Sequence, residues 1–319
     1  MTVETIRGPV EIARLGRTLM HEHIFVLDPG ALRAYQHTWG ESYWNAEREI
    51  AKAVAALRRV REAGIETIVD PTVLGIGRHV PNIERVNAEV DINIIVATGY
   101  FAFYELPLFF RLRSAEDVAA FFVRDIREGV DGTGVKAAFL KCAVEEPGVV
   151  GDVPKILEAI ALAHRETAAP VMVHTNAEAN TGLPALEALS AYGVDPRRVV
   201  VAHAGDSSDM TYLRAMLELG ASLGFDRFPG EHILPLQERL DTLIELLELG
   251  YADRIHLSHD GACFLDFTAG DPQVGQMGLE GDYLFIDHTV LPALLRAGIE
   301  QAMIDEMMIV NPTRFFEQP

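Results

Sequence analysis

Eight short apolar runs, separated by longer stretches with helical periodicity, constrain the fold of this chain more than any other feature. Short runs of this kind are typical of parallel strands that are covered on both faces. We expect strands at Thr18–Met20, Thr67–Asp70, Asn93–Thr98, Ala137–Leu140, Val171–Val173, Val199–Ala202, Ser222–Phe225 and Ile255–Leu257. A chain in which strands and helices alternate folds either as an open doubly wound sheet or as a closed barrel.

The stretches between these runs carry apolar residues at the spacing of a helix with one buried side. In Ala46–Ala63, for example, Ile50, Val54 and Leu57 fall on one side. We expect further helices at Ala115–Glu128, Val153–Glu166, Leu186–Ala191, Asp209–Leu219, Pro235–Leu249 and His288–Ala297, and a shorter one near Pro81–Ala88. No linker divides the chain, so we expect one domain over residues 1–319, which accommodates a barrel of about 250 residues with insertions.

The charge and composition of the chain narrow its environment and its partners. A formal net charge of −20 argues against nucleic acid or an anionic membrane as a partner. No stretch approaches the roughly 20 apolar residues of a membrane span. The two cysteines, Cys142 and Cys263, are too few for a disulfide framework, and Met1–Arg17 lacks the apolar segment of a signal peptide. We therefore expect a cytoplasmic protein that acts on a small molecule.

Several of the expected strands lead into a polar side chain that a buried strand would not otherwise contain. These residues are His21, His23, Lys141, His174, His203 and Asp260. In a (β/α)₈ barrel the carboxyl ends of all strands converge on one mouth, where the active site lies. The first strand is not followed by the Gly-x-Gly-x-x-Gly turn of dinucleotide-binding sheets. Together these observations favour a closed TIM barrel with the six side chains at its mouth.

The six residues together indicate a metal centre, although one of them alone would not. A single buried histidine is more often structural than a ligand, and for a pair the two interpretations are about equal. Lysine and aspartate, in contrast, are costly to bury unless they are paired or bound to a cation. Reaction of the Lys141 amine with carbon dioxide would give a carbamate that can bridge two cations. Imidazole and carboxylate ligands suit zinc, iron, cobalt or manganese, so we expect two divalent metal ions without a choice among these.

Motifs along nearly the whole chain resemble the phosphotriesterase family of the amidohydrolase superfamily. The motifs are Gly16-Arg17-Thr18-Leu19-Met20-His21-Glu22-His23, Lys141 before Glu145-Glu146-Pro147-Gly148, Val173-His174-Thr175, Ala202-His203-Ala204-Gly205-Asp206, Ser258-His259-Asp260 and Asn311-Pro312-Thr313-Arg314-Phe315. Within the family the chain is most similar to the phosphotriesterase-like lactonases. In Gly224-Phe225-Asp226-Arg227 an arginine follows the aspartate, and the stretch from Arg227 to the helix near Pro235 is short.

This resemblance implies an amidohydrolase-type (β/α)₈ barrel, a mechanism and, because dimers are common among such lactonases, a homodimer. His21, His23 and Asp260 would hold one metal, His174 and His203 would hold the second, and carbamylated Lys141 would bridge them. A hydroxide between the metals would attack a lactone carbonyl, and Asp260 would act as the catalytic residue by accepting the proton and passing it on. The expected substrates are N-acyl homoserine lactones, whose hydrolysis is called quorum quenching, or other γ- and δ-lactones. Weak hydrolysis of organophosphate triesters is expected as well.

The resemblance also indicates residues around the metals. Family lactonases often have a tyrosine after the third strand, where the alignment places Phe101, with Phe103 nearby; a shift of one residue would restore Tyr100 or Tyr104. The residues expected to contact substrate are Phe101, Phe103, Arg227 and Cys263, and those expected to support the metal ligands are Asp206 and Asp226. Surface ion pairing of Asp206 with Arg227 and core packing of Cys263 remain alternatives. The loop after Phe264, with Phe267, Met277 and Leu279, would either line an acyl-chain channel or pack as a lid.

The resemblance leaves two other interpretations of the site open. The same ligands would serve a dedicated phosphotriesterase or another amidohydrolase-type enzyme, such as a cyclic-amide hydrolase, because fold and metals do not determine the substrate. A catalytically silent barrel that binds a ligand or a partner is a third interpretation, and the intact set of six candidate ligands counts against it.

Overall fold

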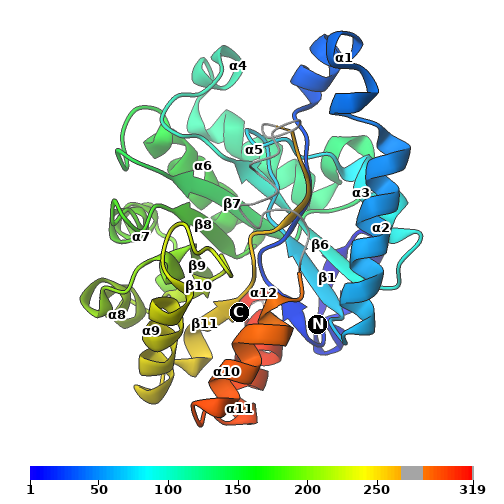
Figure 1. Cartoon of the computed structure of the whole chain (residues 1–319). Helices are drawn as coiled ribbons and strands as arrows, with labels where there is room; N and C mark the ends of the chain where they lie inside the picture. Colours follow the sequence, from blue (N-terminus) through cyan, green and yellow to red (C-terminus); the bar gives the residue numbers. More distant parts are fainter. Residues whose placement is uncertain (267–282, 318–319) are drawn as a thin grey trace.

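The computed structural model describes residues 1–266 and 283–317, and it confirms the predicted (β/α)₈ barrel. All eight predicted strands are present and parallel, in the spatial order β11-β10-β9-β8-β7-β6-β5-β3 (Figure 1). Their bounds are β3 Thr18–Leu19, β5 Thr67–Asp70, β6 Asn93–Tyr100, β7 Phe139–Val144, β8 Val171–Thr175, β9 Val199–Ala202, β10 Ser222–Phe225 and β11 Ile255–Leu257.

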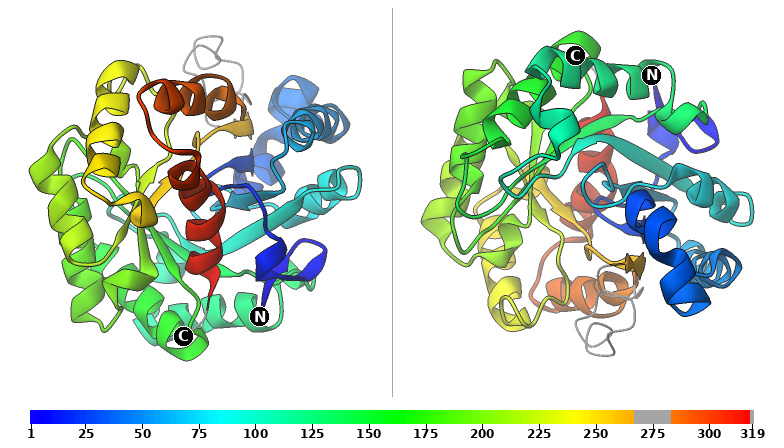
Figure 2. Two further views of the ribbon diagram at one scale, coloured as in Figure 1. Left: turned by 90° about the horizontal axis from the view of Figure 1, so that it is seen from below. Right: turned by 90° about the horizontal axis from the view of Figure 1, so that it is seen from above.

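Helices surround these strands as a ring, which is visible from both ends of the barrel (Figure 2). The helices at or near predicted positions are α2 Ala46–Glu62, α3 Val80–Asn87, α5 Ala115–Arg127, α6 Val153–Thr167, α7 Gly182–Ala191, α8 Met210–Glu218, α9 Leu236–Glu248 and α10 Leu291–Arg296. Elements not predicted from the sequence include the antiparallel hairpin β1 Thr2–Thr5 and β2 Gly8–Glu11, and the helices α1 Pro29–Tyr43, α4 Leu108–Arg111, α11 Gln301–Asp305 and α12 Asn311–Phe316. A π-helix, Ile286–Val290, leads into α10. No helix in the described ranges is long and apolar enough to cross a membrane.

The barrel closes between its first and last strands by an indirect route. Among the described residues no ladder pairs β3 with β11. Instead, the chain beyond each of them forms a second short strand, β4 (His23–Val26) and β12 (Ala262–Leu265), and these two pair in parallel. The strands that close the barrel therefore lie at its mouth, directly beside the predicted metal ligands.

Alternation along each strand separates two hydrophobic cores. One core fills the barrel and contains Phe139 and Met172, whereas Leu140 and Cys142 face the helices and belong to the outer core. Cys142 is therefore turned away from the interior, as the alternation predicts. Phe315 and Phe316 of α12 pack on Phe139 at 6.0 and 6.1 Å between ring centres, so the C-terminal helix covers the bottom of the barrel (Figure 2, left).

Three strands extend past their predicted ends, and the differences affect the site; β8 continues to Thr175 and so includes His174. Strand β7 continues to Val144, so Lys141 lies inside the strand rather than after it, and it shares the interior face with Phe139. Strand β6 continues to Tyr100, which is buried in the outer core, so Phe101 is the first residue beyond the strand. The predicted strand Ala137–Leu140 ended before Lys141 because that residue is polar, whereas the backbone of β7 continues to pair with β8 beyond Lys141.

Gly99 in β6 provides a test of how tightly β6 and β7 approach each other. Its φ is 142°, and a Cβ atom there would collide with the carbonyl oxygen of Lys141. We expect Gly99→Ala to lower the free energy of unfolding by about 3 kcal/mol or more, measured by urea denaturation, because backbone strain adds to the collision. At Gly193 (φ 93°) a Cβ would meet nothing within 4 Å, so Gly193→Ala should show the strain alone, about 1–2 kcal/mol. Equal losses in the two variants would contradict this account.

Candidate metal centre

The first three predicted ligands meet at the barrel mouth. His21 follows β3, His23 begins β4, and Asp260 lies between β11 and β12. The Oδ1 atom of Asp260 lies 3.3 Å from Nε2 of His21 and 3.1 Å from Nε2 of His23. These three residues form a group whose ligand atoms lie within 4.8 Å of one another, so they could hold a metal ion together.

The other two predicted histidines form a second pair of converging ligand atoms. Nδ1 of His174, in β8, lies 2.8 Å from Nε2 of His203, which follows β9. Nε2 of His203 is also 3.9 Å from Oδ2 of Asp260, so the two groups adjoin. His203 and Asp260 both have left-handed backbone conformations, with φ of 66° and 53°, which are uncommon for residues other than glycine. Such conformations are often found at functional sites, where surrounding contacts hold them.

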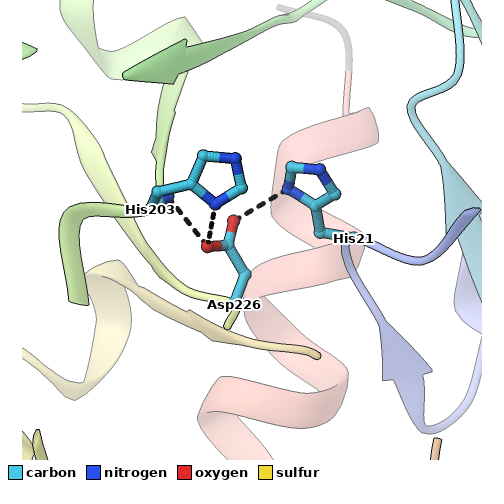
Figure 3. Close-up of side chains that lie close together, drawn as sticks. All are labelled: His21, His203 and Asp226. Carbon is cyan, nitrogen blue, oxygen red and sulfur yellow. Dashed lines mark hydrogen bonds and ion pairs between the residues drawn. The ribbon is translucent and has the colours of Figure 1, made fainter. Parts of the chain in front are cut away.

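Asp226 holds two of these histidines in place from below (Figure 3). This residue follows β10, and its Oδ2 and Oδ1 atoms lie 2.9 Å from Nδ1 of His21 and Nδ1 of His203, respectively. The backbone N–H of His203 also donates to Oδ1 at 2.8 Å. Since Asp226 accepts the proton on each Nδ1, both Nε2 atoms are left without a proton and available to a metal. His21, His203 and Asp226 also form a possible metal group by distance, but these contacts make Asp226 an orienting residue.

The remaining two histidines are oriented by groups that the sequence analysis did not assign. Nδ1 of His23 lies 2.6 Å from the hydroxyl of Thr72, which itself donates to Asp70. Nε2 of His174 lies 2.6 Å from Oε1 of Glu145, and this hydrogen bond lowers the pKa of Glu145 to about 2. Each histidine therefore has one nitrogen engaged with a neighbour, which leaves the other free. The position of Glu145 in the motif after Lys141 was the one sequence signal for this role.

Burial determines the protonation of these histidines. Loss of hydration lowers the pKa of His174 to about 4 and holds that of His203 well below its ordinary value, and it lowers that of His21 as well. Burial works against ionisation of Asp260, but the neighbouring His21, His203 and Arg227 outweigh it and hold the Asp260 pKa well below its usual range. The lowered pKa values favour neutral imidazoles at His21, His174 and His203 and an ionised carboxylate at Asp260, the forms that bind divalent cations.

Lys141 provides the decisive test of whether the site fits two metals. The residue is fully buried, and its Nζ atom has no hydrogen-bond partner among the described residues. Burial lowers the pKa of this amine to about 8. An unpaired buried amine is costly in a folded protein. Lys141 lines the same cavity as the histidines, and a carboxylate on its amine would be able to bind the same cations as they do. The donor set of this site therefore suits divalent cations.

A cavity of about 730 Å³ opens above these residues. Its walls are largely apolar, and the predicted substrate-contacting residues Phe101, Phe103 and Arg227 line it. The Phe101 ring centre lies 4.7 Å from that of His174, so Phe101, and not Tyr100, faces the site. Cys263 does not line the cavity in the described part of the chain; its Sγ atom lies 3.1 Å from the hydroxyl of Tyr283. Strand β12 turns this side chain toward the core, so the expected substrate contact of Cys263 has no support, and the predicted roles of Phe267, Met277 and Leu279 fall outside the described residues.

Arg227 connects Asp260 to a buried ion-pair chain. Its Nε donates to Oδ2 of Asp260 at 2.9 Å and its Nη1 to Oδ2 of Asp206 at 3.0 Å. Oδ1 of Asp206 in turn accepts from the fully buried Arg239 of α9 at 2.8 Å. Although burial lowers the pKa of Arg227, the carboxylates of Asp260 and Asp206 raise it above its ordinary value. Asp206 and Arg227 are therefore partners inside the barrel mouth rather than a surface ion pair.

The family model described as "Phosphotriesterase family" matches residues 1–316. The chain belongs to the phosphotriesterase family. A phosphotriesterase homology protein of Mycobacterium tuberculosis (strain ATCC 25618 / H37Rv) is 39% identical, with 99% of this chain and 98% of that protein covered. The aryldialkylphosphatase of Saccharolobus solfataricus is 34% identical, with 97% and 98% covered. A solved structure of the phosphotriesterase from Mycobacterium tuberculosis superposes with a TM-score of 0.94 at 39% identity, covering 100% of this chain and 99% of that one.

Membership in the phosphotriesterase family places this protein among metal-dependent hydrolases. The family match thus confirms the resemblance that the motifs indicated, and it agrees with the His/Asp groups at the mouth. The roles assigned above to individual residues rest on the geometry of this phosphotriesterase-family site, and they stay predictions.

Asp226 offers a test of the orienting contacts. We expect Asp226→Asn to weaken binding of divalent metal by about 10–100-fold, because an amide presents an N–H₂ group to one of the two histidines and removes the charge. Metal affinity can be measured by competition with a chromophoric chelator. Asp241→Asn is the control, because Asp241 is exposed on α9 and bonds only to Gln237 in the described structure. Unchanged affinity in Asp226→Asn would contradict the assigned role.

Proposed function

We propose that this protein is a binuclear metal-dependent lactonase. The observation that supports it is the arrangement of His21, His23 and Asp260 beside the His174–His203 pair, with the unpaired amine of Lys141 at the same cavity. In this proposal His21, His23 and Asp260 would hold one cation, His174 and His203 would hold the second, and Lys141, as a carbamate, would supply oxygen ligands to both. Zinc, iron, cobalt and manganese remain the candidates for the metal.

The proposed reaction adds water across the ester bond of a lactone and yields a hydroxy acid. When bound, the two cations would make the attacking water more acidic and would stabilise negative charge on the carbonyl oxygen. Asp260 takes the proton from the water and returns it to the alkoxide that leaves when the ring opens. Its Oδ1 atom faces His21 and His23, while Arg227 holds the Oδ2 atom and thereby keeps the carboxylate in one orientation.

The walls of the cavity support a substrate with an apolar portion. Phe228, Pro229 and Ile233 belong to the stretch between β10 and α9, and they line the cavity together with Phe101. An aliphatic acyl chain fits such a wall because burial of apolar area is favourable by roughly 25 cal/mol per Å². Phe101 offers no hydroxyl to the substrate, so orientation of the carbonyl depends on Arg227 and the metals.

Organophosphate triesters are the second candidate substrates. The aryldialkylphosphatase of Saccharolobus solfataricus, which covers almost the whole chain, favours this activity. We propose that triester hydrolysis is the weaker activity, because the connection from Arg227 to α9 is short and forms the wall of the cavity.

A substrate panel tests this ranking. With metal-loaded protein, we expect kcat/KM for γ- and δ-lactones, N-acyl homoserine lactones included, to exceed that for dialkyl aryl phosphates by at least about 100-fold, a difference of about 2.7 kcal/mol in transition-state binding. Ring opening is followed by pH-stat titration and phosphate-ester cleavage by release of the phenol. Rapid turnover of triesters or cyclic amides without lactone opening would refute the lactonase proposal, and no turnover of any ester would favour a silent barrel.

Asp260→Asn tests the assigned proton transfer. We expect kcat for the best lactone to fall by about 10²–10⁴-fold, because an amide cannot accept the proton from the attacking water. Metal content should be measured alongside, since Asp260 is also a proposed ligand. Full activity in this variant would exclude Asp260 as the acid–base residue.

The carbamate on Lys141 has a pH dependence that follows from the lowered pKa. Only the neutral amine reacts with carbon dioxide, so with a pKa of about 8 the reactive fraction rises about fivefold between pH 7 and pH 8. We expect the initial rate of carbamate formation in metal-free protein, at fixed dissolved ¹³CO₂ and followed by ¹³C NMR, to rise by that factor. Lys141→Met should show no such resonance and should bind fewer than two metals per chain. A pH-independent rate, or two metals in the variant, would contradict the proposal.

A further inference from the structure

Glu22 is a fully buried carboxylate between two metal-ligand candidates, and nothing in the proposed reaction uses it. It stands between His21 and His23 in the chain, but unlike them it does not line the cavity. Along an extended backbone, neighbouring side chains point to opposite sides, so Glu22 faces the junction between the first and last strands. A buried carboxylate requires several hydrogen-bond donors, so the donors that contact Glu22 show which part of the structure it stabilises.

Among the described residues, the Glu22 side chain has four hydrogen bonds, and all of them come from the turn that carries Asp260. Its Oε1 atom accepts from the hydroxyl of Ser258 at 2.8 Å, from the backbone N–H of His259 at 2.9 Å and from Nδ1 of His259 at 2.6 Å. Its Oε2 atom accepts from the backbone N–H of Gly261 at 2.9 Å. The carboxylate of Glu22 is thus hydrogen-bonded to the turn on both sides of Asp260.

These contacts lie where the barrel has no ladder. Strands β3 and β11 are not paired in the described structure, and backbone bonds from Asp260 to His21 (3.0 Å) and from His23 to Gly261 (2.7 Å) join the chain just beyond them. His259 extends the connection, because its Nε2 atom accepts from the N–H of Ile286 at 3.1 Å. Glu22 therefore links the start of the barrel to its last strand and to the helix that follows.

A residue larger than glycine at position 261 would crowd both Glu22 and Tyr283. A Cβ atom at Gly261 would lie 3.2 Å from Oε2 of Glu22 and 3.0 Å from Cε1 of Tyr283. Asp260 itself has a φ of 53°, a left-handed conformation that is uncommon for residues other than glycine and that surrounding contacts can hold. The bonds from Glu22 to the residues on either side supply that restraint.

We infer that Glu22 is a positioning residue that holds the turn Ser258–Gly261 so that the Asp260 carboxylate points at Nε2 of His21 and His23. The inference rests on the catalytic role proposed for Asp260. Glu22 touches neither the cavity nor the ligand atoms, so we expect its effect on catalysis to pass through this turn and, by way of the Ser258 hydroxyl, to the backbone N–H of His21.

Glu22→Gln is the direct test, because it keeps the size of the side chain but replaces one acceptor oxygen by an N–H₂ group that faces a donor. We expect kcat, with metal in excess, to fall by about 10–100-fold while KM changes by less than about twofold, since supporting contacts of this type act on geometry rather than on substrate binding. In the metal-free protein, amide hydrogen exchange of a peptide covering 258–261 should be faster than in the parent.

Two further variants separate positioning from a loss of stability. Gly261→Ala leaves the carboxylate of Glu22 intact but pushes the turn away from it, so it should reproduce the loss of kcat and the faster exchange. Ile160→Val, in the outer core on α6, is the matched control: it should lower the melting temperature without changing kcat or exchange at 258–261.

The outcomes decide between the inference and the proposed function. Unchanged kcat and exchange in Glu22→Gln, or a loss of kcat with unchanged exchange at the turn, would overturn the inference, as would an equal loss of kcat in Ile160→Val. If Glu22→Gln does not fold, Gly261→Ala decides by the same criteria. Asp260→Asn is assayed in parallel: if it stays active, the role of Asp260 is wrong, whereas an inactive Asp260→Asn with a fully active Glu22→Gln refutes only the role of Glu22.

Discussion

The carboxylate of Asp226, hydrogen-bonded to His21 and His203 at the same time, is the contact on which the rest of the mouth depends. It joins residues from the first, the sixth and the seventh of the eight barrel strands by two bonds of 2.9 Å. In a buried interior of low dielectric constant such bonds are strong, and an unpaired partner would be costly. They leave Nε2 of both histidines facing Asp260, so the direction of the proposed ligands follows from a carboxylate whose two oxygens each contact a histidine Nδ1.

The same principle extends around the mouth. Thr72 is hydrogen-bonded to His23, and Glu145 is hydrogen-bonded to His174. Glu22 accepts hydrogen bonds from His259 and Gly261, the residues on either side of Asp260. Each of the five proposed histidine and aspartate ligands is therefore in contact with a second polar group, whereas the Lys141 amine has no partner among the described residues. A site of this type keeps its geometry while the apolar walls above it vary, which explains how one family can contain enzymes for different esters.

Much of this arrangement could be predicted from the sequence, and the exceptions have physical causes. The eight strands were recognisable because strands covered on both faces must be apolar, and the five histidine and aspartate ligands stood out because they interrupted those runs. The run at Ala137–Leu140 ended too early, since Lys141 is polar but still pairs with β8. Cys263 was expected at the substrate, whereas β12 directs it toward Tyr283. Strand β12, which closes the barrel, could not be predicted from the sequence because its pairing partner β4 lies more than 200 residues away along the chain.

The sequence by itself determined the barrel, the family and the identity of the candidate ligands, because periodicity and residue type are local properties. Only the tertiary structure decided which nitrogen of each histidine is held by a neighbour, that Phe101 rather than Tyr100 faces the site, and that Lys141 is buried without a partner among the described residues. It also brought Glu22 to the turn at Asp260 across more than 230 residues of chain. These features depend on distances between residues remote in sequence, and such distances exist only once the barrel has closed.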